Sequence, residues 1–412
     1  MKFIIADSTL QTFMGHSFEY AKALGCSLQD RGAEVIILSS QKVSGSIVKE
    51  FNVIPTFRYD FNQRFGLPAL KGRHRKLLNR IIFQLHSFFF IQDLIAVNRR
   101  LKCSSDSIVL FHTINQNHLF PIIRWAERFP YKTCPKVVLV LRFTTNRPPQ
   151  IAEDAKKYYR HAFRYLDRSS VNSRFFFFSD SELLVNEYRA FTRLPFHVLP
   201  IPHTQARFNR SNESRSCVPS GPICLSYLGD ARMNKGFHFL PYLFKKMAPM
   251  LESQRICAEV QANIRDENDL FVKQAIKQLK RLSNIVLHEN ELSSSEYYAL
   301  LFRSHIVILP YTLDYYHSQT SGIFGEALAW GKPVIVPRGT WMYRQSKQHG
   351  AGVGFLPNDR QDLCESVIKA VENYPALRTK AVEASHKWRS FHNQASYVEI
   401  LFEKLKNESF KK

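Results

Sequence analysis

The sequence lacks the patterns that mark several common functional classes. Its seven cysteines stand singly and none forms a Cys-x-x-Cys pair, so we expect free thiols, no structural zinc and a reducing compartment. No Gly-x-Gly-x-x-Gly follows a predicted strand, which disfavours a nicotinamide or flavin enzyme, and there is no P-loop or Gly-x-Ser-x-Gly elbow. The 15 histidines show no metal-ligand spacing on a helix, so we expect neither a metal nor a cofactor.

Long apolar runs are also scarce. The apolar run at the start of the chain is too short for a secretory signal and instead predicts a buried strand over Phe3–Ala6. The most apolar long window, residues 81–97, contains Gln84, His86, Gln92 and Asp93, which makes it a poor transmembrane span. We therefore expect a cytoplasmic protein, with peripheral attachment to the inner face of the plasma membrane as an alternative.

Acidic residues are few: 35 Asp and Glu stand against 57 Lys and Arg, a net charge of +22. Between Arg58 and Lys102, ten basic residues face only Asp60 and Asp93. Such a surface attracts phosphorylated substrates, anionic lipid headgroups or nucleic acid, or it is simply a solvated basic face. No nucleic-acid recognition motif accompanies the charge, so we expect no nucleic-acid partner.

Short apolar runs alternate with helical patterns along most of the 412 residues. This alternation predicts an α/β fold with parallel sheets, and two Rossmann-like domains explain it better than one very large sheet. The segment 201–223 is rich in Pro, Ser, Asn and Arg and predicts the linker. We place the domains at 1–202, 203–390 and 391–412, the last being a terminal helix.

The stretch SQTSGIFGEALAWGKPVIVP, residues 318–337, predicts a polar loop, a helix capped by Ser321, and a strand. Gly331 and Pro333 end the helix. The helix amino terminus offers unpaired N–H groups to a phosphate, and Gly322 and Gly325 permit close approach of a ligand. Glu326 can accept two hydrogen bonds from a vicinal diol such as a ribose, or it can serve only the helix dipole.

A second anion site is predicted in YLGDARMNKGFHFL, where a strand ends at Gly229. Arg232 and Lys235 follow in the loop before a helix that we expect to begin near Gly236. Two cations there would neutralise a diphosphate, and the alternative is an ordinary charged surface loop.

The first domain has polar residues at the expected strand ends. Gly15 permits close approach at the start of a helix, and His16 would point into a cleft. We expect His112 and Arg142 to close two further strands at their carboxyl ends. A lone histidine is more often structural than catalytic, but two polar strand ends favour a cleft.

The segment 71–102 predicts one or two helices with basic ends and an apolar pattern that includes Ile81, Leu85 and Phe88. Two interpretations remain open: an interfacial helix on an anionic membrane, or a helix packed on the first sheet.

These motifs together resemble GT-B glycosyltransferases, especially the retaining family 4 type. The resemblance rests on SGIFGEALAWGKPVI, YLGDARMNKGF, GHSFEYAKALGCSLQDRGAEVIIL and FFSDSELLVNEY with VLPIP, and covers about residues 3–205 and 222–405. It implies metal-independent, retaining transfer of a sugar from a nucleoside-diphosphate sugar to a glycan or lipid-linked acceptor in cell-surface polysaccharide or glycolipid biosynthesis. It also implies that the last helix crosses back onto the amino-terminal domain.

The resemblance further implies the roles of individual residues. Arg232 and Lys235 would hold the leaving diphosphate, Glu326 would bind the ribose, and Gly15 and His16 would lie on the acceptor side. The expected catalytic group is Arg232, Lys235, Glu326, His112 and Arg142. The expected donor-binding residues are Gly229, Ser318, Thr320, Ser321, Gly322, Ile323, Phe324 and Gly325.

Two positions depart from the family pattern. Ser318 stands where relatives carry an acid that contacts the transferred sugar, and Arg142 stands where many carry an active-site histidine. Arginine cannot act as a base at neutral pH, but it can bind a phosphate or carboxylate. The alternative function is therefore a catalytically impaired GT-B-like protein that binds a nucleotide sugar or a glycan.

Overall fold

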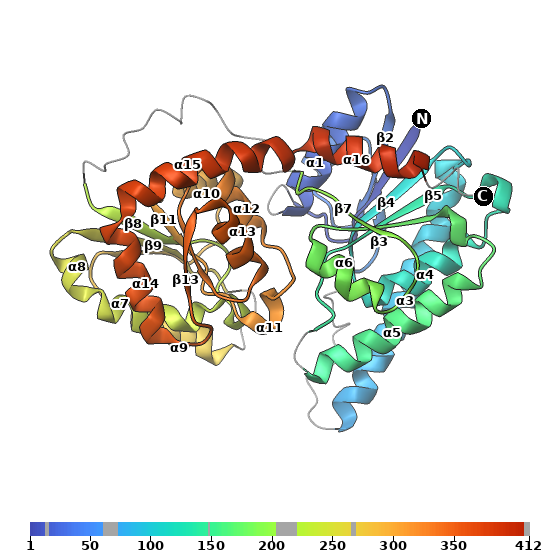
Figure 1. The fold of residues 1–412 in the computed structure, drawn as a ribbon. Helices are drawn as coiled ribbons and strands as arrows, with labels where there is room; N and C mark the ends of the chain where they lie inside the picture. Colours follow the sequence, from blue (N-terminus) through green and yellow to red (C-terminus); the bar gives the residue numbers. More distant parts are fainter. Residues whose placement is uncertain (13–15, 61–72, 147–148, 203–220, 265–268, 408–412) are drawn as a thin grey trace. The chain divides into compact units, whose positions relative to one another are not determined.

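The chain forms two α/β units, each built on its own parallel sheet (Figure 1). The computed structural model describes residues 1–412 except 13–15, 61–72, 147–148, 203–220, 265–268 and 408–412. Unit 1 comprises Met1–His203 and Gln394–Lys412, and unit 2 comprises Thr204–Asn393. The terminal helix α16 (Gln394–Asn407) thus belongs to unit 1 although it follows unit 2 in the chain.

Unit 1 has a seven-stranded sheet in the order β3-β2-β1-β4-β5-β6-β7. Its strands are β1 (Lys2–Ala6), β2 (Glu34–Ser40), β3 (Val53–Phe57), β4 (Ile108–Ile114), β5 (Lys136–Leu141), β6 (Phe175–Ser179) and β7 (Phe196–Val198). Its other helices are α1 (His16–Gln29), α2 (Gly45–Glu50), α3 (Arg73–Leu101), α4 (Gln116–Ala126), α5 (Pro149–Asp167) and α6 (Glu182–Arg189). The sequence patterns predict every strand except β3, because Pro55 interrupts an edge strand that pairs on one side only.

Alternating side chains of these strands enter two apolar cores, as expected of a parallel sheet covered on both faces. Ile4, Val109 and Phe177 pack beneath α3 to α6, whereas Phe3, Ile5 and Leu110 pack against α1 and α16. The helix α16 is fixed by Val398 and Leu401 in the second core, among other contacts. Burial of this apolar stripe explains why the last helix leaves unit 2 and completes unit 1.

The single helix α3 has 29 residues and two different faces. Leu94 and Val97 lie in the core, and the ring of Phe90 stacks on Phe57 at 5.0 Å between centroids. The other face leaves Leu77 60% and Phe88 55% exposed. Among the described residues, Ile81–Asn98 is the one helical stretch long and apolar enough to cross a membrane, and 28% of it is buried.

Unit 2 has a six-stranded sheet in the order β10-β9-β8-β11-β12-β13. Its strands are β8 (Ile223–Tyr227), β9 (Ile256–Gln261), β10 (Ile285–His288), β11 (Ile306–Ile308), β12 (Val334–Pro337) and β13 (Gly352–Phe355). Its helices are α7 (Leu240–Lys246), α8 (Ala248–Glu252), α9 (Leu270–Leu279), α10 (Ser294–Arg303), α11 (Leu313–Tyr316), α12 (Gly322–Ala329), α13 (Trp341–His349), α14 (Arg360–Glu372) and α15 (Tyr374–Phe391). The sequence patterns predict all six of these strands.

Candidate functional site

The sheet order of unit 2 defines where a ligand is expected. The chain runs from β8 outward to β9 and β10, then returns to the other side of β8 as β11. Ligands of open parallel sheets bind beyond the carboxyl ends of the strands at such a reversal. The segments that follow β8 and β11 are the two glycine-rich motifs singled out in the sequence, so both lie at the same edge of the sheet.

Gly229, just after β8, is the point where the two motifs meet. Its φ of +97° belongs to the region that favours glycine, and its N–H donates to Gln261 Oε1 at 2.6 Å. A Cβ atom added to Gly229 would lie 2.5 Å from Ile323 Cδ1 and 2.8 Å from Lys235 Nζ. Lys235 and the first turn of α12 therefore converge on a backbone position where a larger residue would be strained and would displace the ends of both side chains.

The cations of the first motif are held by Asp230, a partner that sequence reasoning missed. Lys235 Nζ lies 2.5 Å from Asp230 Oδ1, and Arg232 Nε lies 3.0 Å from Asp230 Oδ2. Lys235 is only 8% exposed, so it needs this counter-charge. The three groups leave one net positive charge at the edge of the sheet, next to the start of α12.

A short 3₁₀ turn, Met233–Lys235, sets the position of Lys235. Gly236 ends the turn with φ +69°, and a Cβ atom there would lie 1.7 Å from Pro310 O after β11. A second 3₁₀ turn follows, and α7 begins only at Leu240. The helix expected to begin near Gly236 is thus displaced by one turn, because close packing of the backbone against Pro310 requires a glycine.

The second motif forms the start of α12 as predicted. Ser321 is the N-cap, and its hydroxyl accepts from the N–H of Phe324 at 3.3 Å. Helix geometry gives the amides of Gly322 and Ile323 no acceptor within the helix. The N–H of Gly325, by contrast, already donates to Ser321 O. Ser318 and Thr320 are buried beside this first turn. The groups available to an anion are therefore the first two amides of the helix.

The other end of α12 is anchored by two arginines of α15. Arg389 Nη1 donates to Ala329 O at 2.6 Å, and Arg378 donates to Gly331 O. Gly331 has φ +61°, which confirms the predicted helix stop. Cations at the carboxyl end of a helix complement its dipole, so the arginines fix the helix that presents the amides.

Glu326 lies in the second turn of α12 and is 3% exposed. The hydroxyl of Tyr297 donates to its Oε2 at 2.5 Å, and that of Tyr298 donates to Oε1 at 3.4 Å. Burial, followed by the charge of Glu326, raises the pKa of Tyr297 well above its usual value, so this hydroxyl keeps its proton. Sequence reasoning missed both tyrosines, because they lie on α10, far from Glu326 in the chain.

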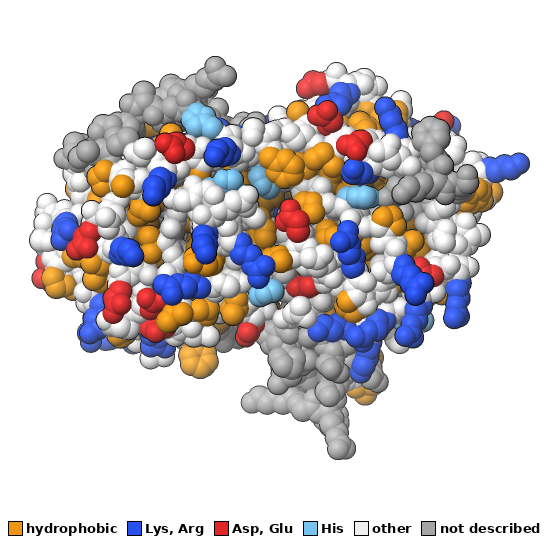
Figure 2. Space-filling view, in the orientation of Figure 1, with side chains coloured by type: hydrophobic (Ala, Val, Ile, Leu, Met, Phe, Trp, Pro, Cys, Tyr) orange, Lys and Arg blue, Asp and Glu red, His pale blue; other side chains and the backbone are white. Residues whose placement is uncertain are grey.

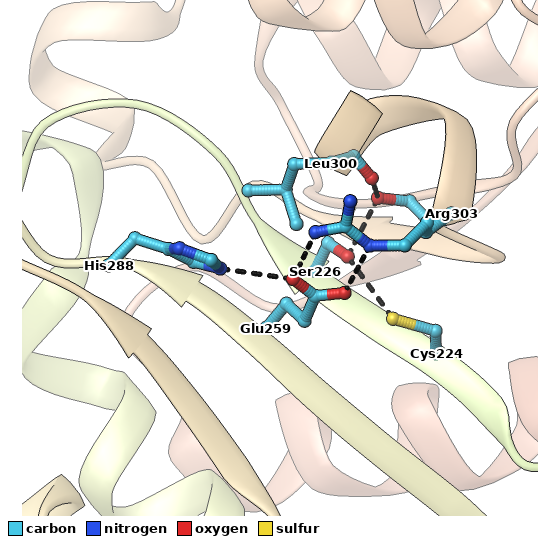
Figure 3. Close-up of polar contacts among 7 residues, drawn as sticks. Cys224, Ser226, Glu259, His288, Leu300 and Arg303 are labelled. Carbon is cyan, nitrogen blue, oxygen red and sulfur yellow. Dashed lines mark hydrogen bonds and ion pairs between the residues drawn. The ribbon is translucent and has the colours of Figure 1, made fainter. Parts of the chain in front are cut away.

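His288, the last residue of β10, joins an ion cluster on the sheet (Figure 3). Glu259 Oε2 lies 3.0 Å from His288 Nε2 and 2.7 Å from Arg303 Nη2. The hydrogen bond from Arg303 is the main reason why the pKa of Glu259 is lowered. Near this cluster, Ser226 accepts from Ser304 at 2.7 Å. These contacts tie β9 and β10 to α10, the helix that carries Tyr297.

The corresponding edge of unit 1 carries a polar cluster of buried side chains. His112 is fully buried inside β4, and its Nε2 lies 3.3 Å from Asp7 Oδ2. Its ring stacks on Tyr20 with centroids 4.1 Å apart. Burial lowers the pKa of His112 to about 4 despite the nearby carboxylate of Asp7, so the ring is neutral at pH 7. His112 thus lies inside the strand rather than at its end, since β4 continues to Ile114.

Arg142 directly follows β5, as predicted. Its Nε donates to Asp180 Oδ2 at 2.8 Å, and its guanidinium carbon lies 5.3 Å from the centre of the Tyr20 ring. Its side chain is 19% exposed. Among the residues that the structure describes, its terminal amino groups have no hydrogen-bond partner, so they remain available to a ligand. Gly15 and the side chain of His16 lie outside the described residues.

Over the described residues, no group of three or more His, Cys, Asp or Glu side chains could hold a metal ion.

The strand-end edges of the two units offer different chemistry. Unit 2 presents cations, amides and a hydrogen-bonded carboxylate, which suit a diphosphate and a diol. Unit 1 presents a guanidinium group beside a buried polar cluster.

Comparison with known proteins identifies the fold class. No protein-family model matches the sequence, and no curated protein is detectably similar to it. Solved structures are similar over nearly the whole chain: HepE of Anabaena is 13% identical with a TM-score of 0.67, over 99% of this chain and 100% of that one. Sucrose-phosphate synthase of Thermosynechococcus elongatus is 12% identical with a TM-score of 0.65, over 98% and 99%. A glycosyltransferase of Rickettsia africae is 16% identical with a TM-score of 0.62, over 100% and 99%. The GT-B fold class predicted from the sequence is confirmed.

Proposed function

We propose that this chain is a glycosyltransferase that takes a sugar from a nucleoside-diphosphate sugar and transfers it to a hydroxyl of a glycan or lipid-linked acceptor. The observation that carries the proposal is the meeting of Lys235 and the first turn of α12 at Gly229. The Anabaena structures contain UDP and UDP-glucose, which supports a nucleoside diphosphate as the ligand of this fold. Polysaccharide or glycolipid biosynthesis is the corresponding process.

In the proposed reaction the bond between the sugar carbon and the diphosphate oxygen breaks, and a bond to the acceptor oxygen forms. The acceptor proton passes to the leaving diphosphate, so no metal or covalent intermediate is needed. Lys235, Arg232 and the amides of Gly322 and Ile323 stabilise the charge that develops on the diphosphate. Transfer with retention at the sugar carbon is part of the proposal.

Glu326 would bind the ribose diol of the donor. Because Tyr297 already donates to one carboxylate oxygen, the side chain of Glu326 is oriented before the ligand arrives. Ser318, which replaces the acid of related sequences, would contact the transferred sugar through a neutral hydroxyl. We expect Ser318 to bind that sugar more weakly than an acid would, so the selectivity for the sugar should change.

The test is slow hydrolysis of UDP-sugars by the purified chain, followed as release of free sugar. Glu326→Ala and Lys235→Ala should each lower it strongly, whereas Lys277→Ala, which removes an exposed charge on α9, should leave it unchanged. The second candidate, a non-catalytic binding protein, is favoured by Ser318 and Arg142. UDP binding without turnover of any donor or acceptor would support it and contradict the enzyme.

Arg142 would act on the acceptor side. Its Nε is committed to Asp180, and the open terminal amino groups suit a phosphate or carboxylate of the acceptor. Arg142→Lys keeps the charge but loses the planar fork, so the KM for such an acceptor should rise about tenfold while donor hydrolysis stays constant. Equal loss with neutral and anionic acceptors would contradict this role.

We also propose that unit 1 attaches peripherally to an anionic membrane. Lys157, Arg160 and Arg164 of α5 form an exposed basic stripe that continues to Arg168 just after the helix. Figure 2 shows Lys and Arg side chains gathered over this part of the molecule. Phe83 of α3 stacks on Tyr158 of α5 at 3.8 Å, so the helix that exposes Leu77 and Phe88 packs against the helix that carries the stripe. Apolar residues beside cations are typical of interfacial binding.

Flotation with vesicles tests the attachment. The chain should float with anionic vesicles at low salt and lose this binding at high salt. Phe88→Ser with Arg164→Gln should abolish flotation, whereas Lys42→Gln with Lys132→Gln removes more charge and should leave it. No flotation of the unaltered chain at low salt would contradict membrane attachment and leave the proposed transfer untouched.

A further inference from the structure

Unit 2 contains a second basic pocket that the proposed donor site does not use. It measures about 400 Å³, within the range of small-molecule sites. It lies among α7, α9 and the start of α14, and none of its lining residues belongs to the candidate donor site. The lining is His238, Pro241, Tyr242, Lys245, Gln278, Arg281, Leu282 and Arg360.

The charge of this pocket has one sign. Lys245, Arg281 and Arg360 come from three separate segments of the chain, and no carboxylate lines the pocket. Within the described part of the chain, none of the three forms an ion pair. The three side chains are exposed, so water screens their mutual repulsion, and an anion that enters the pocket would be attracted by all three.

An aspartate caps each of the two flanking helices, α14 and α9. Asp359 caps α14 by accepting from the N–H groups of Gln361 at 2.9 Å and Asp362 at 3.0 Å. Asp269 caps α9 by accepting from the N–H of Val272 at 3.1 Å. Backbone donors hold each carboxylate at its own helix start, and neither lines the pocket, although the charge of Asp269 partly opposes the lowering of the pKa of His238.

The inner wall offers aromatic and polar groups. The guanidinium carbon of Arg360 lies 5.9 Å from the Phe239 ring and 6.0 Å from the Tyr242 ring, which restricts its orientation. His238 Nδ1 is a buried atom without a hydrogen-bond partner among the described residues. Burial, followed by the charge of Arg360, lowers the pKa of His238, and an anion between the two would relieve that repulsion.

We infer that this pocket binds a phosphate-bearing ligand, with Lys245, Arg281 and Arg360 around the phosphate and Tyr242 and Leu282 against the rest of the molecule. The phosphate belongs either to a soluble metabolite or to a lipid headgroup. This site is separate from the donor diphosphate, and the inference does not depend on catalysis.

The test is calorimetric titration of the full chain with inorganic pyrophosphate at low ionic strength. We expect two classes of site. The double variant Arg281→Ala with Arg360→Ala should lose one class of site. Its affinity for pyrophosphate at that site should fall tenfold or more for each charge-assisted hydrogen bond removed. Lys235→Ala should lose the other class. The matched control, Lys277→Ala with Lys369→Ala, removes two exposed charges of α9 and α14 outside the pocket and should keep both classes.

Vesicles separate the two sources of phosphate. Binding to phosphatidic acid vesicles that requires Arg281 and Arg360, without a pyrophosphate site that depends on them, identifies a lipid headgroup. A pyrophosphate site that depends on these two residues, without such vesicle binding, identifies a soluble ligand. Two outcomes overturn the inference: the pocket variant binds both probes as the unaltered chain does, or the control variant loses as much binding. Near-ultraviolet circular dichroism checks that each variant is folded.

Discussion

Unit 2 forms its candidate site from contiguous motifs and backbone groups, whereas unit 1 gathers single side chains from separate strands. In unit 2, Gly229 and Gly236 have positive φ and meet Ile323 and Pro310 of the neighbouring segment. In unit 1, Asp7 and Arg142 directly follow β1 and β5, and His112 lies inside β4. A backbone site tolerates almost no change at its glycines, whereas a side-chain site can exchange its chemistry and keep its fold. We therefore expect the side chains of unit 1 to differ between related proteins with different acceptors, and the diphosphate site of unit 2 to stay the same.

The largest expected effect is that of Lys235→Ala in unit 2. In the proposed reaction Lys235 stabilises the leaving diphosphate, so removing this buried cation should lower donor turnover by about 10² to 10³-fold. Arg142→Lys in unit 1 should leave donor hydrolysis unchanged. Steady-state rates with a UDP-sugar, measured with and without acceptor, check this. Equal losses in the two variants would erase the distinction between the units.

Two glycines allow the cost in stability of a backbone clash to be separated from the cost of a positive φ. Gly236 in unit 2 and Gly32 in unit 1 have φ of +69° and +76°, but only Gly236 has atoms within 4 Å of an added Cβ. Gly32→Ala should cost about 1 to 2 kcal/mol from the angle alone. Gly236→Ala adds a backbone clash and should cost well above that, as judged by urea unfolding. Similar costs would mean that Pro310 moves aside.

The tyrosines around Glu326 sharpen the account of the donor site. Tyr297→Phe removes a hydrogen bond of 2.5 Å and Tyr298→Phe one of 3.4 Å, so the first should weaken UDP binding about tenfold and the second much less. Isothermal titration with UDP measures both. An equal effect would show that the carboxylate does not depend on the shorter bond.

A smaller effect is expected on stability in acid. Burial, followed by the nearby His86, lowers the pKa of His118 in unit 1 to about 3, and its Nδ1 accepts from the N–H of Asn115 at 3.2 Å. Below a pH of about 6.5 the unfolded chain binds a proton that the folded chain does not, so stability falls by up to about 1.4 kcal/mol per pH unit until the folded pKa is reached. His118→Gln should flatten the decline in urea midpoint over this range. An unchanged slope would contradict the buried neutral ring.

How far the sequence could predict this molecule follows from how local each signal is. The strands of unit 2 and the cap and stop of α12 rest on adjacent residues, so Ser321 and Gly331 were identified from the chain alone. Asp230 stood in the quoted motif, but only its geometry reveals that it pairs with both cations. Tyr297 lies 29 positions from Glu326, and its role depends on how α10 packs. The burial of His112 depends on Tyr20 and on strand β4 extending to Ile114, which no spacing encodes.

The most direct test of the central claim is a crystal structure of the chain with UDP. The account predicts the diphosphate at the carboxyl edge of the sheet in unit 2, with oxygens in hydrogen-bond reach of Lys235 Nζ and of the amides of Gly322 and Ile323. The ribose should lie at Glu326. A diphosphate bound elsewhere, with Lys235 still paired only with Asp230, would contradict it.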